Sequence, residues 1–216
     1  MDCVPELSGA LYVPAQELLI VADLHLEHGA SLARRGLYVP PFDTSATLQQ
    51  LEAVVEAINP QRLIMLGDTF HDAVAHQEID QTTRSRLLTI TKRCETFWLS
   101  GNHDPQGPKD LGGACVDEIA IGRLLLRHIP GIVPEGCAEI SGHLHPGASI
   151  IQRGRRIRGK CFVADDKRLI MPAFGAYTGG LSLRSSAFDG MFDASIAKVW
   201  MIGRNAIHRL PFSRVS

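Results

Sequence analysis

The feature that most constrains the fold is a repeated order in which a short apolar run ends at a polar block rich in Asp, His or Asn. Residues 18–22, 62–66 and 96–99 are three such runs. Short continuous runs bounded by turn residues are typical of strands that are covered on both faces of a sheet. We expect these strands to be parallel, because a helical pattern separates each one from the next. The polar blocks are then predicted to lie on loops at one rim of the sheet.

Two segments between these strands have the spacing of helices. The first contains apolar residues that recur at helical intervals after a predicted cap at Thr44, namely Leu48, Leu51, Val55 and Ile58. The second is residues 83–92. Strand, helix, strand, helix and strand in this order predict an α/β arrangement in the first half of the chain.

The second half contains short, turn-separated segments that are often β-branched, which is typical of a second, largely antiparallel sheet. Residues 165–167 and 203–205 read as hairpin turns. We therefore predict the α/β class, as an αββα sandwich of two mixed β-sheets flanked by helices, in a single domain over residues 1–216. The predicted strands are residues 115–121, 122–129, 138–141, 149–152, 156–164, 168–171, 194–202 and 206–210.

Composition excludes several classes of protein. No run approaches the roughly 20 apolar residues that a membrane span needs, and no basic and apolar leader begins the chain, so we expect a cytoplasmic protein without a membrane partner. The 5 cysteines are widely spaced and form no C-x-x-C pair, which favours reduced thiols over disulfides or a zinc knuckle. The formal net charge is −1, so any affinity for nucleic acid must come from a local patch.

The polar blocks supply a set of candidate metal ligands. Carboxylates, imidazoles and an amide oxygen suit Mn, Fe or Zn better than Ca. A single D-x-H or H-x-H is commonplace, but turns alone do not explain all the blocks in this order, each at a strand end. We predict a centre that holds two divalent cations, with two carboxylate oxygens of one Asp able to bridge them. The candidates are Asp23, His25, Asp68, Asn102, His128, His143 and His145.

The remaining residues of the Gly-Asn-His-Asp block are candidates for catalysis. Two cations about 3.5–4 Å apart clamp a phosphate and lower the pKa of a bridging water, which can then attack phosphorus. His103 is left over for acid–base work, such as protonating the leaving alkoxide. Asp104 is expected to fix the tautomer of His103 and to keep its ring protonated. The residues thus predict metal-dependent hydrolysis of a phosphate ester.

The order D-x-H, GD, GNHD, H and GHxH over residues 18–146 resembles the signature of the calcineurin-like metallophosphoesterase superfamily. This resemblance implies an αββα fold and a dinuclear centre with His103 as the catalytic side chain. It also implies two sets of ligands, with Asp23, His25, Asp68 and His145 at one metal and Asp68, Asn102, His128 and His143 at the other.

Further segments resemble the bacterial ligase-associated DNA damage response endonucleases, small manganese-dependent phosphoesterases encoded beside a DNA ligase and a helicase. The resemblance implies two Mn²⁺ ions, with Fe or Zn as alternatives. It also implies a DNA substrate, and a role in DNA repair in association with a ligase and a helicase. His28 departs from the subgroup, in which Lys is expected at that place. The segments are residues 22–27, 33–36, 141–146, 159–162 and 172–180.

Alternative functions stay open at this point. A phosphomonoesterase, or a phosphodiesterase for small molecules or cyclic nucleotides, would use the same centre. A non-catalytic scaffold of this fold would lack part of the ligand set, which is complete here. A basic stripe separates the nuclease from the small-molecule enzyme, although phosphate binding and a solvated hairpin edge explain such a stripe equally well. The stripe consists of Arg153, Arg155, Arg156, Arg158 and Lys160.

The other histidines are placed outside the ligand set. His71 follows Asp68 by three residues. Two interpretations are open for it, a hydrogen bond to substrate or to a ligand carboxylate, or a structural role that supports the ligands, and the second is favoured. His28 and His76 are assigned to the surface, and His208 to a terminal strand.

Overall fold

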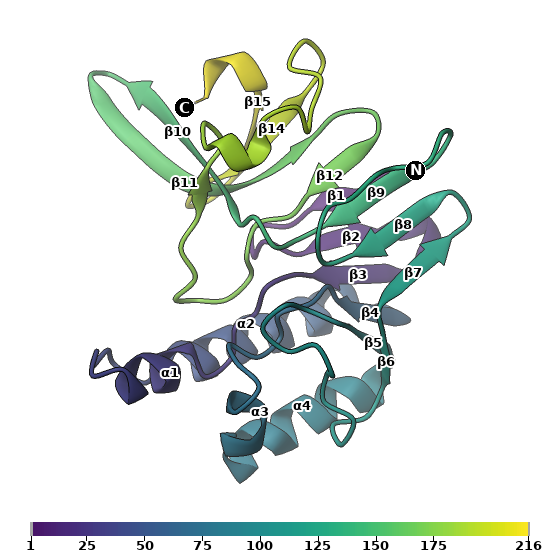
Figure 1. The fold of residues 1–216 in the computed structure, drawn as a ribbon, viewed down its shortest axis with the longest axis vertical. Helices are drawn as coiled ribbons and strands as arrows, with labels where there is room; N and C mark the ends of the chain where they lie inside the picture. The colour runs from purple at the N-terminus through teal and green to yellow at the C-terminus, as the bar shows by residue number, and fades with distance from the viewer. Residues whose placement is uncertain (1, 216) are drawn as a thin grey trace.

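Two β-sheets face one another in the computed structural model, which describes residues 2–215 (Figure 1). The first sheet has the order β1-β2-β3-β4-β5-β6. Strands β3 to β6 are parallel, and β1 and β2 extend the sheet in the antiparallel sense. The three predicted parallel strands are therefore present. The bounds are β1 Val4–Pro5, β2 Leu11–Val13, β3 Leu18–Val21, β4 Arg62–Met65, β5 Glu95–Leu99 and β6 Ala114–Val116.

The α-helices of the described chain all lie between residues 28 and 93, and α2 and α4 bury their apolar faces against the first sheet. Both helices that were predicted from spacing are present. The predicted cap is wrong, because α2 begins before Thr44 and the buried Thr44 hydroxyl instead accepts a hydrogen bond from the Glu27 N–H (2.7 Å). The bounds are α1 His28–Arg34, α2 Asp43–Ile58, α3 Ala75–Glu78 and α4 Gln81–Arg93.

The second sheet has the order β13-β10-β11-β12-β9-β8-β7, and β14 and β15 are added beside β11. It mixes parallel and antiparallel pairs, which confirms the predicted class of two mixed sheets. Residues 115–121, predicted as one strand, divide at Asp117 between β6 of the first sheet and β7 of the second. The bounds are β7 Glu118–Ile121, β8 Leu124–Arg127, β9 Ala138–Ser141, β10 Pro146–Gln152, β11 Arg155–Ala164, β12 Arg168–Ile170, β13 Leu181–Ser182, β14 Lys198–Ile202 and β15 Ile207–Pro211.

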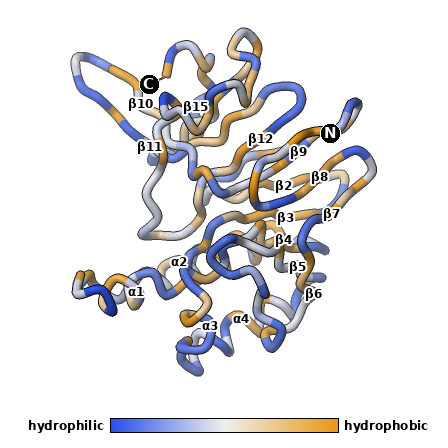
Figure 2. The backbone as a smooth tube through the Cα atoms, in the orientation of Figure 1, coloured by the Kyte–Doolittle hydropathy of each residue, from blue (hydrophilic) through white to orange (hydrophobic). Residues whose placement is uncertain are grey.

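An apolar core joins the two sheets. Ile20 and Ile64 of the first sheet pack in one buried cluster with Ile140 and Phe162 of the second. The outer face of the second sheet is covered by 3-10 turns, with Phe188 in the buried cluster there. Figure 2 shows hydrophobic residues along β2 and β3 and a mainly hydrophilic outer end of the β10–β11 hairpin. No helix within residues 2–215 has the length and apolar character to cross a bilayer.

Candidate metal centre

The polar blocks that follow β3 and β4 lie side by side. The Asp23 N–H donates to Gly67 O (3.2 Å), and the His25 N–H donates to Asp68 O (3.0 Å). A block of the second sheet reaches the same place, because the His143 N–H donates to both carboxylate oxygens of Asp23 (3.2 and 3.0 Å). The centre is therefore built where the rims of the two sheets meet.

Several ligand candidates adopt a left-handed backbone conformation, which is uncommon for residues other than glycine. The left-handed residues bend the chain sharply after each strand, so both members of the D-x-H pair and of the H-x-H pair reach the same centre. Strain of this kind costs about 1–3 kcal/mol per residue and is typical of functional sites. The φ angles are 55° at Asp23, 46° at His25, 46° at Asp68, 68° at His143 and 44° at His145.

The first ligand group consists of Asp23, His25 and His145. Asp23 is fully buried, and its Oδ1 lies 3.0 Å from Nε2 of His145. The same nitrogen lies 3.3 Å from Nε2 of His25. Burial lowers the pKa of His25 to about 3, so the ring is neutral at pH 7 and offers a lone pair to a cation.

The second ligand group consists of Asp68, His128 and His143. Nε2 of His128 lies 3.2 Å from Asp68 Oδ2 and 3.1 Å from Asn102 Oδ1, which brings Asn102 to this group. The other ring nitrogen, Nδ1 of His128, lies 3.0 Å from Leu66 O. A hydrogen bond there orients the ring so that Nε2 is turned to the ligands.

Asp68 lies between the two groups. Its Oδ2 is 3.2 Å from Nε2 of His128 and 3.9 Å from Nε2 of His25, and its Oδ1 accepts a hydrogen bond from the His103 N–H (2.9 Å). Burial by itself raises the pKa of Asp68, but the hydrogen bond from His128 and the nearby positive charge outweigh it and lower the pKa to about 2. An ionised carboxylate in this position has the form required of a bridging ligand.

The donor atoms of both groups fit a divalent cation. Each group places one carboxylate oxygen and two imidazole nitrogens within 4.8 Å of one another. The facing nitrogens of His25 and His145 repel one another unless a proton or a cation lies between them. Oxygen and nitrogen donors of this kind suit Mn, Fe or Zn. All of the ligand candidates predicted from the sequence are brought to this centre, while the ions that they bind stay a prediction.

His103 lies at the edge of the centre, with 38% of its side chain exposed. Its Nε2 is 4.0 Å from Asp68 Oδ2, and its Nδ1 is 2.6 Å from His71 O. Because a carbonyl oxygen only accepts, Nδ1 carries the hydrogen of this bond. Nε2, which is nearer the ligands, is therefore the atom of His103 that gains or loses a proton.

The structure differs from the sequence-based expectation at Asp104. Its Oδ2 accepts a hydrogen bond from the Phe70 N–H (3.0 Å), and its Oδ1 has no hydrogen-bond partner among residues 2–215. Burial raises the pKa of Asp104 to about 7. The carbonyl of His71, rather than the carboxylate of Asp104, fixes the tautomer of His103, and Asp104 supports the loop that follows β4.

Glycine is required at two positions beside the ligands. A Cβ atom at Gly101 would overlap Oδ1 of Asp68 and would lie 2.7 Å from Oδ1 of Asp104. A Cβ atom at Gly67, where φ is 80°, would overlap the ring of His128. The glycines of the GD and GNHD motifs therefore let a ligand side chain approach the backbone closely.

Two histidines outside the predicted ligand set, His28 and His71, lie near it. The rings of His28 and His71 are stacked, with centroids 4.0 Å apart and planes at 16°. Nitrogen atoms of His25, His71 and His103 lie within 4.8 Å of one another. The surface assignment of His28 was wrong, and its spacing of three residues from His25 was the only signal. His76 is half-buried, away from the ligand candidates, with its Nε2 2.6 Å from Asp110 Oδ1.

The basic stripe separates into two parts. The Lys160 ammonium donates to Ala173 O (2.7 Å), Gly175 O (2.7 Å) and Thr178 Oγ1 (3.2 Å), and the Gly175 N–H donates to Asp23 O (3.2 Å). Lys160 thus holds a loop against the first ligand block. Arg158 donates to a backbone carbonyl. The cations at residues 153–156 are exposed instead.

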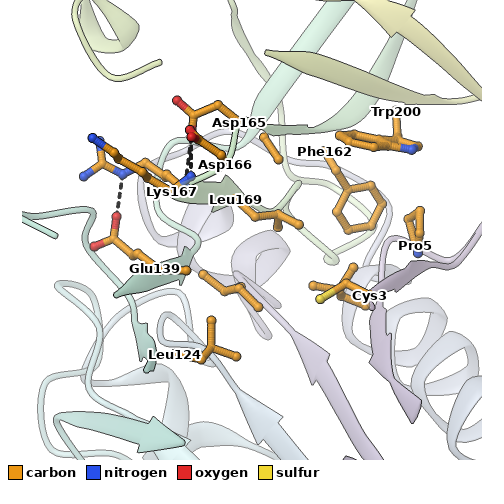
Figure 3. Close-up of a pocket in the computed structure, with 15 residues that line it drawn as sticks. Cys3, Pro5, Leu124, Glu139, Phe162, Asp165, Asp166, Lys167, Leu169 and Trp200 are labelled. Atoms are coloured by element: carbon orange, nitrogen blue, oxygen red, sulfur yellow. Dashed lines mark hydrogen bonds and ion pairs between the residues drawn. The ribbon is translucent and has the colours of Figure 1, made fainter. Parts of the chain in front are cut away.

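An apolar cavity of about 270 Å³ lies apart from this centre (Figure 3). Phe162, Leu169 and Trp200 line it, and Glu139 and Lys167 lie on its rim. None of the ligand candidates lines this cavity.

Comparison with known proteins gives a family and structural neighbours. The family model described as calcineurin-like phosphoesterase matches residues 17–151. The chain is similar to the Pseudomonas putida nuclease MPE, with 28% identity, coverage of 97% of this chain and 99% of that chain, and a TM-score of 0.70. It is also similar to Yfce, a phosphoesterase from E. coli, with 14% identity, coverage of 90% and 98%, and a TM-score of 0.45. No curated protein sequence matches the chain.

Proposed function

Since this chain belongs to the calcineurin-like phosphoesterase family, we propose that it is a metal-dependent DNA endonuclease that acts in DNA repair. Membership of the family makes it a hydrolase of phosphoester bonds that uses divalent metal. The finer proposal has three parts: a centre of two cations, a nucleic acid substrate, and a role beside a DNA ligase and a helicase.

The observation that carries the proposal of two cations is the position of Asp68 between two ligand groups. Its Oδ2 lies 3.2 Å from His128 of one group and 3.9 Å from His25 of the other. We assign Asp23, His25, Asp68 and His145 to one cation and Asp68, Asn102, His128 and His143 to the other. When bound, such cations neutralise the charge of a phosphate and lower the pKa of a water molecule.

The side chain that we assign to proton transfer is His103. Its Nδ1–H is held by the carbonyl of His71, which leaves Nε2 free to donate a proton to the departing ester oxygen. The ring is partly exposed at the mouth of the centre, whereas Asp68 behind it is buried. We propose that Asp104 acts indirectly, by keeping the loop after β4 in place through its bond to Phe70.

Similarity over almost the whole chain to the Pseudomonas putida nuclease MPE supports a nucleic acid substrate. The segments at residues 22–27, 141–146 and 172–180 resemble those of the ligase-associated endonucleases and support manganese, DNA and repair. The competing function, hydrolysis of phosphomonoesters or small diesters, would use the same ligands. The two functions differ in whether DNA is cut.

The proposal is tested by incubating the protein with supercoiled plasmid DNA and Mn²⁺ and measuring nicking. We expect nicked and linear DNA in the presence of Mn²⁺ and no cleavage in the presence of EDTA. Hydrolysis of nitrophenyl phosphate or bis-nitrophenyl phosphate without any DNA cleavage would contradict the nuclease and favour the small-molecule enzyme. Failure to hydrolyse any of these substrates with Mn²⁺, Fe²⁺ or Zn²⁺ would favour a non-catalytic scaffold.

His103→Ala tests the assigned acid. We expect cleavage to fall about 10²- to 10⁴-fold, the usual contribution of a positioned proton donor, with the metal content unchanged because no ligand is removed. Turnover and bound metal are measured on the same preparation. His76→Ala is the matched control, since His76 is bonded to Asp110 on the surface. Turnover of His103→Ala close to that of the wild type would refute the assignment.

A further inference from the structure

The β10–β11 hairpin forms a two-stranded ribbon beyond the body of the second sheet. Residues 149–152 pair with residues 155–158. Neighbouring strands pair only near its base, β13 at Pro146 and Gly147 and β14 at residues 161–164. Within the described chain, the outer part of the ribbon therefore has ladder hydrogen bonds only between its own two strands (Figure 1).

The charged residues of this ribbon are all basic. Residues 140–164 contain five Arg and Lys residues and no Asp or Glu, although the whole chain has a net charge of −1. Arg153, Arg155 and Arg156 are exposed, and none of the ion pairs in residues 2–215 involves them. By contrast, Arg127 and Arg168 both bind the buried Glu139. The outer arginines thus present free guanidinium groups, which suit phosphate because their planar fork binds two oxygens.

The base of the ribbon is attached to the metal centre. β10 begins at Pro146, directly after the ligand candidate His145, whose carbonyl accepts a hydrogen bond from the Leu181 N–H (2.8 Å). On the returning strand, Arg158 donates to Gly180 O beside this contact. A strand advances about 3.3 Å per residue, so the outer arginines lie roughly 20 Å along the ribbon from the ligands.

We propose that this ribbon binds the phosphate backbone of duplex DNA that flanks the cleaved bond. The inference rests on the proposed nuclease function and names the form of nucleic acid that the protein holds. A two-stranded β-ribbon fits the major groove of B-DNA, and exposed arginines beside it reach phosphates. Residues 149–158 contain no aromatic side chain on which unpaired bases can stack, which favours duplex over single strands.

The test is Arg153→Gln, Arg155→Gln and Arg156→Gln in one protein. The matched control removes three exposed cations that lie at the ends of α4 and of the β7–β8 hairpin, outside the ribbon. Its substitutions are Lys92→Gln, Arg93→Gln and Arg123→Gln. Binding to a 24-base-pair duplex and to a 24-nucleotide single strand is measured in EDTA, so that affinity is independent of cleavage. Hydrolysis of bis-nitrophenyl phosphate with Mn²⁺ reports an intact centre in each protein.

We expect the ribbon variant to bind duplex at least tenfold more weakly, with unchanged hydrolysis of the small diester. Each phosphate contact contributes about 0.9 to the slope of log affinity against log salt. The ribbon variant lacks three such contacts. Between 50 and 200 mM salt the wild type should therefore lose about 40-fold more affinity for the duplex than the ribbon variant. The wild type should prefer the duplex to the single strand, and the control variant should match the wild type.

A series of duplexes tests the position of the contact. Base pairs rise about 3.4 Å each, so about six base pairs span the length of the ribbon. The difference in duplex affinity between the wild type and the ribbon variant should disappear for flanks of three base pairs. It should reach its full size for flanks of twelve base pairs. Equal duplex affinity of the two proteins would overturn the inference. The inference would also be overturned if the ribbon variant self-associates on a sizing column and shows no other change. Self-association would indicate that the arginines protect the edge of the ribbon from aggregation. If the wild type cleaves no DNA, the proposed nuclease function is contradicted instead. The two outcomes are distinguishable because DNA binding is measured separately from cleavage.

Discussion

At the scale of single residues, the centre depends on a glycine without a Cβ atom as well as on the side chains of the ligand candidates. Gly101 lies against Asp68, and any Cβ atom there would overlap the carboxylate. The sequence motif indicates the ligand candidates, but it does not distinguish a glycine needed for backbone freedom from one needed for space. At Gly101 the requirement is space, because its φ angle is not in the left-handed range.

Gly101→Ala is therefore expected to displace Asp68 and weaken metal binding. Overpacking of a buried site costs about 1–3 kcal/mol of unfolding free energy. Urea unfolding measures this cost, and a metal titration measures the affinity. Gly179→Ala is the control, since nothing lies within 4 Å of a Cβ atom at that position. Equal metal affinity of the Gly101 variant and the wild type would contradict the role assigned to this glycine.

The residues near the centre also mark the limit of reasoning from sequence. The ligand candidates could be found because each follows an apolar run and their order resembles a family signature. The stack of His28 on His71 could not be found, because it depends on how α1 and the loop after β4 meet in space. The same holds for the His71 carbonyl that orients His103, since a backbone acceptor leaves no trace in the sequence.

At the scale of elements, strands and the longer helices were predictable because their apolar periodicity reports burial. The helix α1 was not, since it is short, has no side-chain cap and begins after Glu27 in a left-handed conformation. The division of residues 115–121 into β6 and β7 was not predictable either, because consecutive apolar residues do not reveal which sheet they join. The role of Lys160 was not predictable either, since a half-buried lysine within a basic stripe has the same sequence pattern as its exposed neighbours.

Lys160 gives a prediction about pH at the scale of β11 and the loop that it holds. Burial lowers the pKa of Lys160 from its ordinary value of 10.5 to about 8. Between these two values the unfolded chain binds more protons than the folded protein, so this group makes the unfolding free energy rise with pH. Below pH 8 the full cost of burying the charge is present.

The measurement compares the wild type with Lys160→Met, both in EDTA. From pH 8 to pH 10 the unfolding free energy of the wild type should rise relative to that of the Lys160→Met variant. Lys167→Met, at an exposed hairpin turn, should show no such shift. A difference that stays constant over this range would show that Lys160 titrates as an exposed lysine.

At the scale of the whole molecule, the ligand candidates divide between the two sheets. Asp23 and Asp68 follow β3 and β4 of the first sheet, while His128 and His145 follow β8 and β9 of the second. Each ligand group of carboxylate and imidazole therefore contains residues from both sheets. Cations bound there would join the layers in addition to the apolar core.

Metal should therefore stabilise the fold as a whole. At a free Mn²⁺ concentration of 100 times Kd, we expect about 2.7 kcal/mol of added stability. For a chain of this size that corresponds to a rise in Tm of roughly 5–10 °C, and EDTA should reverse it. Asp68→Asn should lose most of the rise, because one ligand between the two groups is weakened. A Tm that is indifferent to Mn²⁺ in the wild type would contradict the assigned centre.

The division of the ligands also bears on how the chain reaches its active form. The first 102 residues supply Asp23, His25, Asp68 and Asn102, but every remaining ligand candidate follows β8 in the chain. A nascent or partly folded chain whose second sheet has not docked thus has an incomplete set of candidate ligands in both ligand groups. Under the proposed assignment of ligands, we therefore expect a chain whose second sheet has not docked to lack hydrolytic activity.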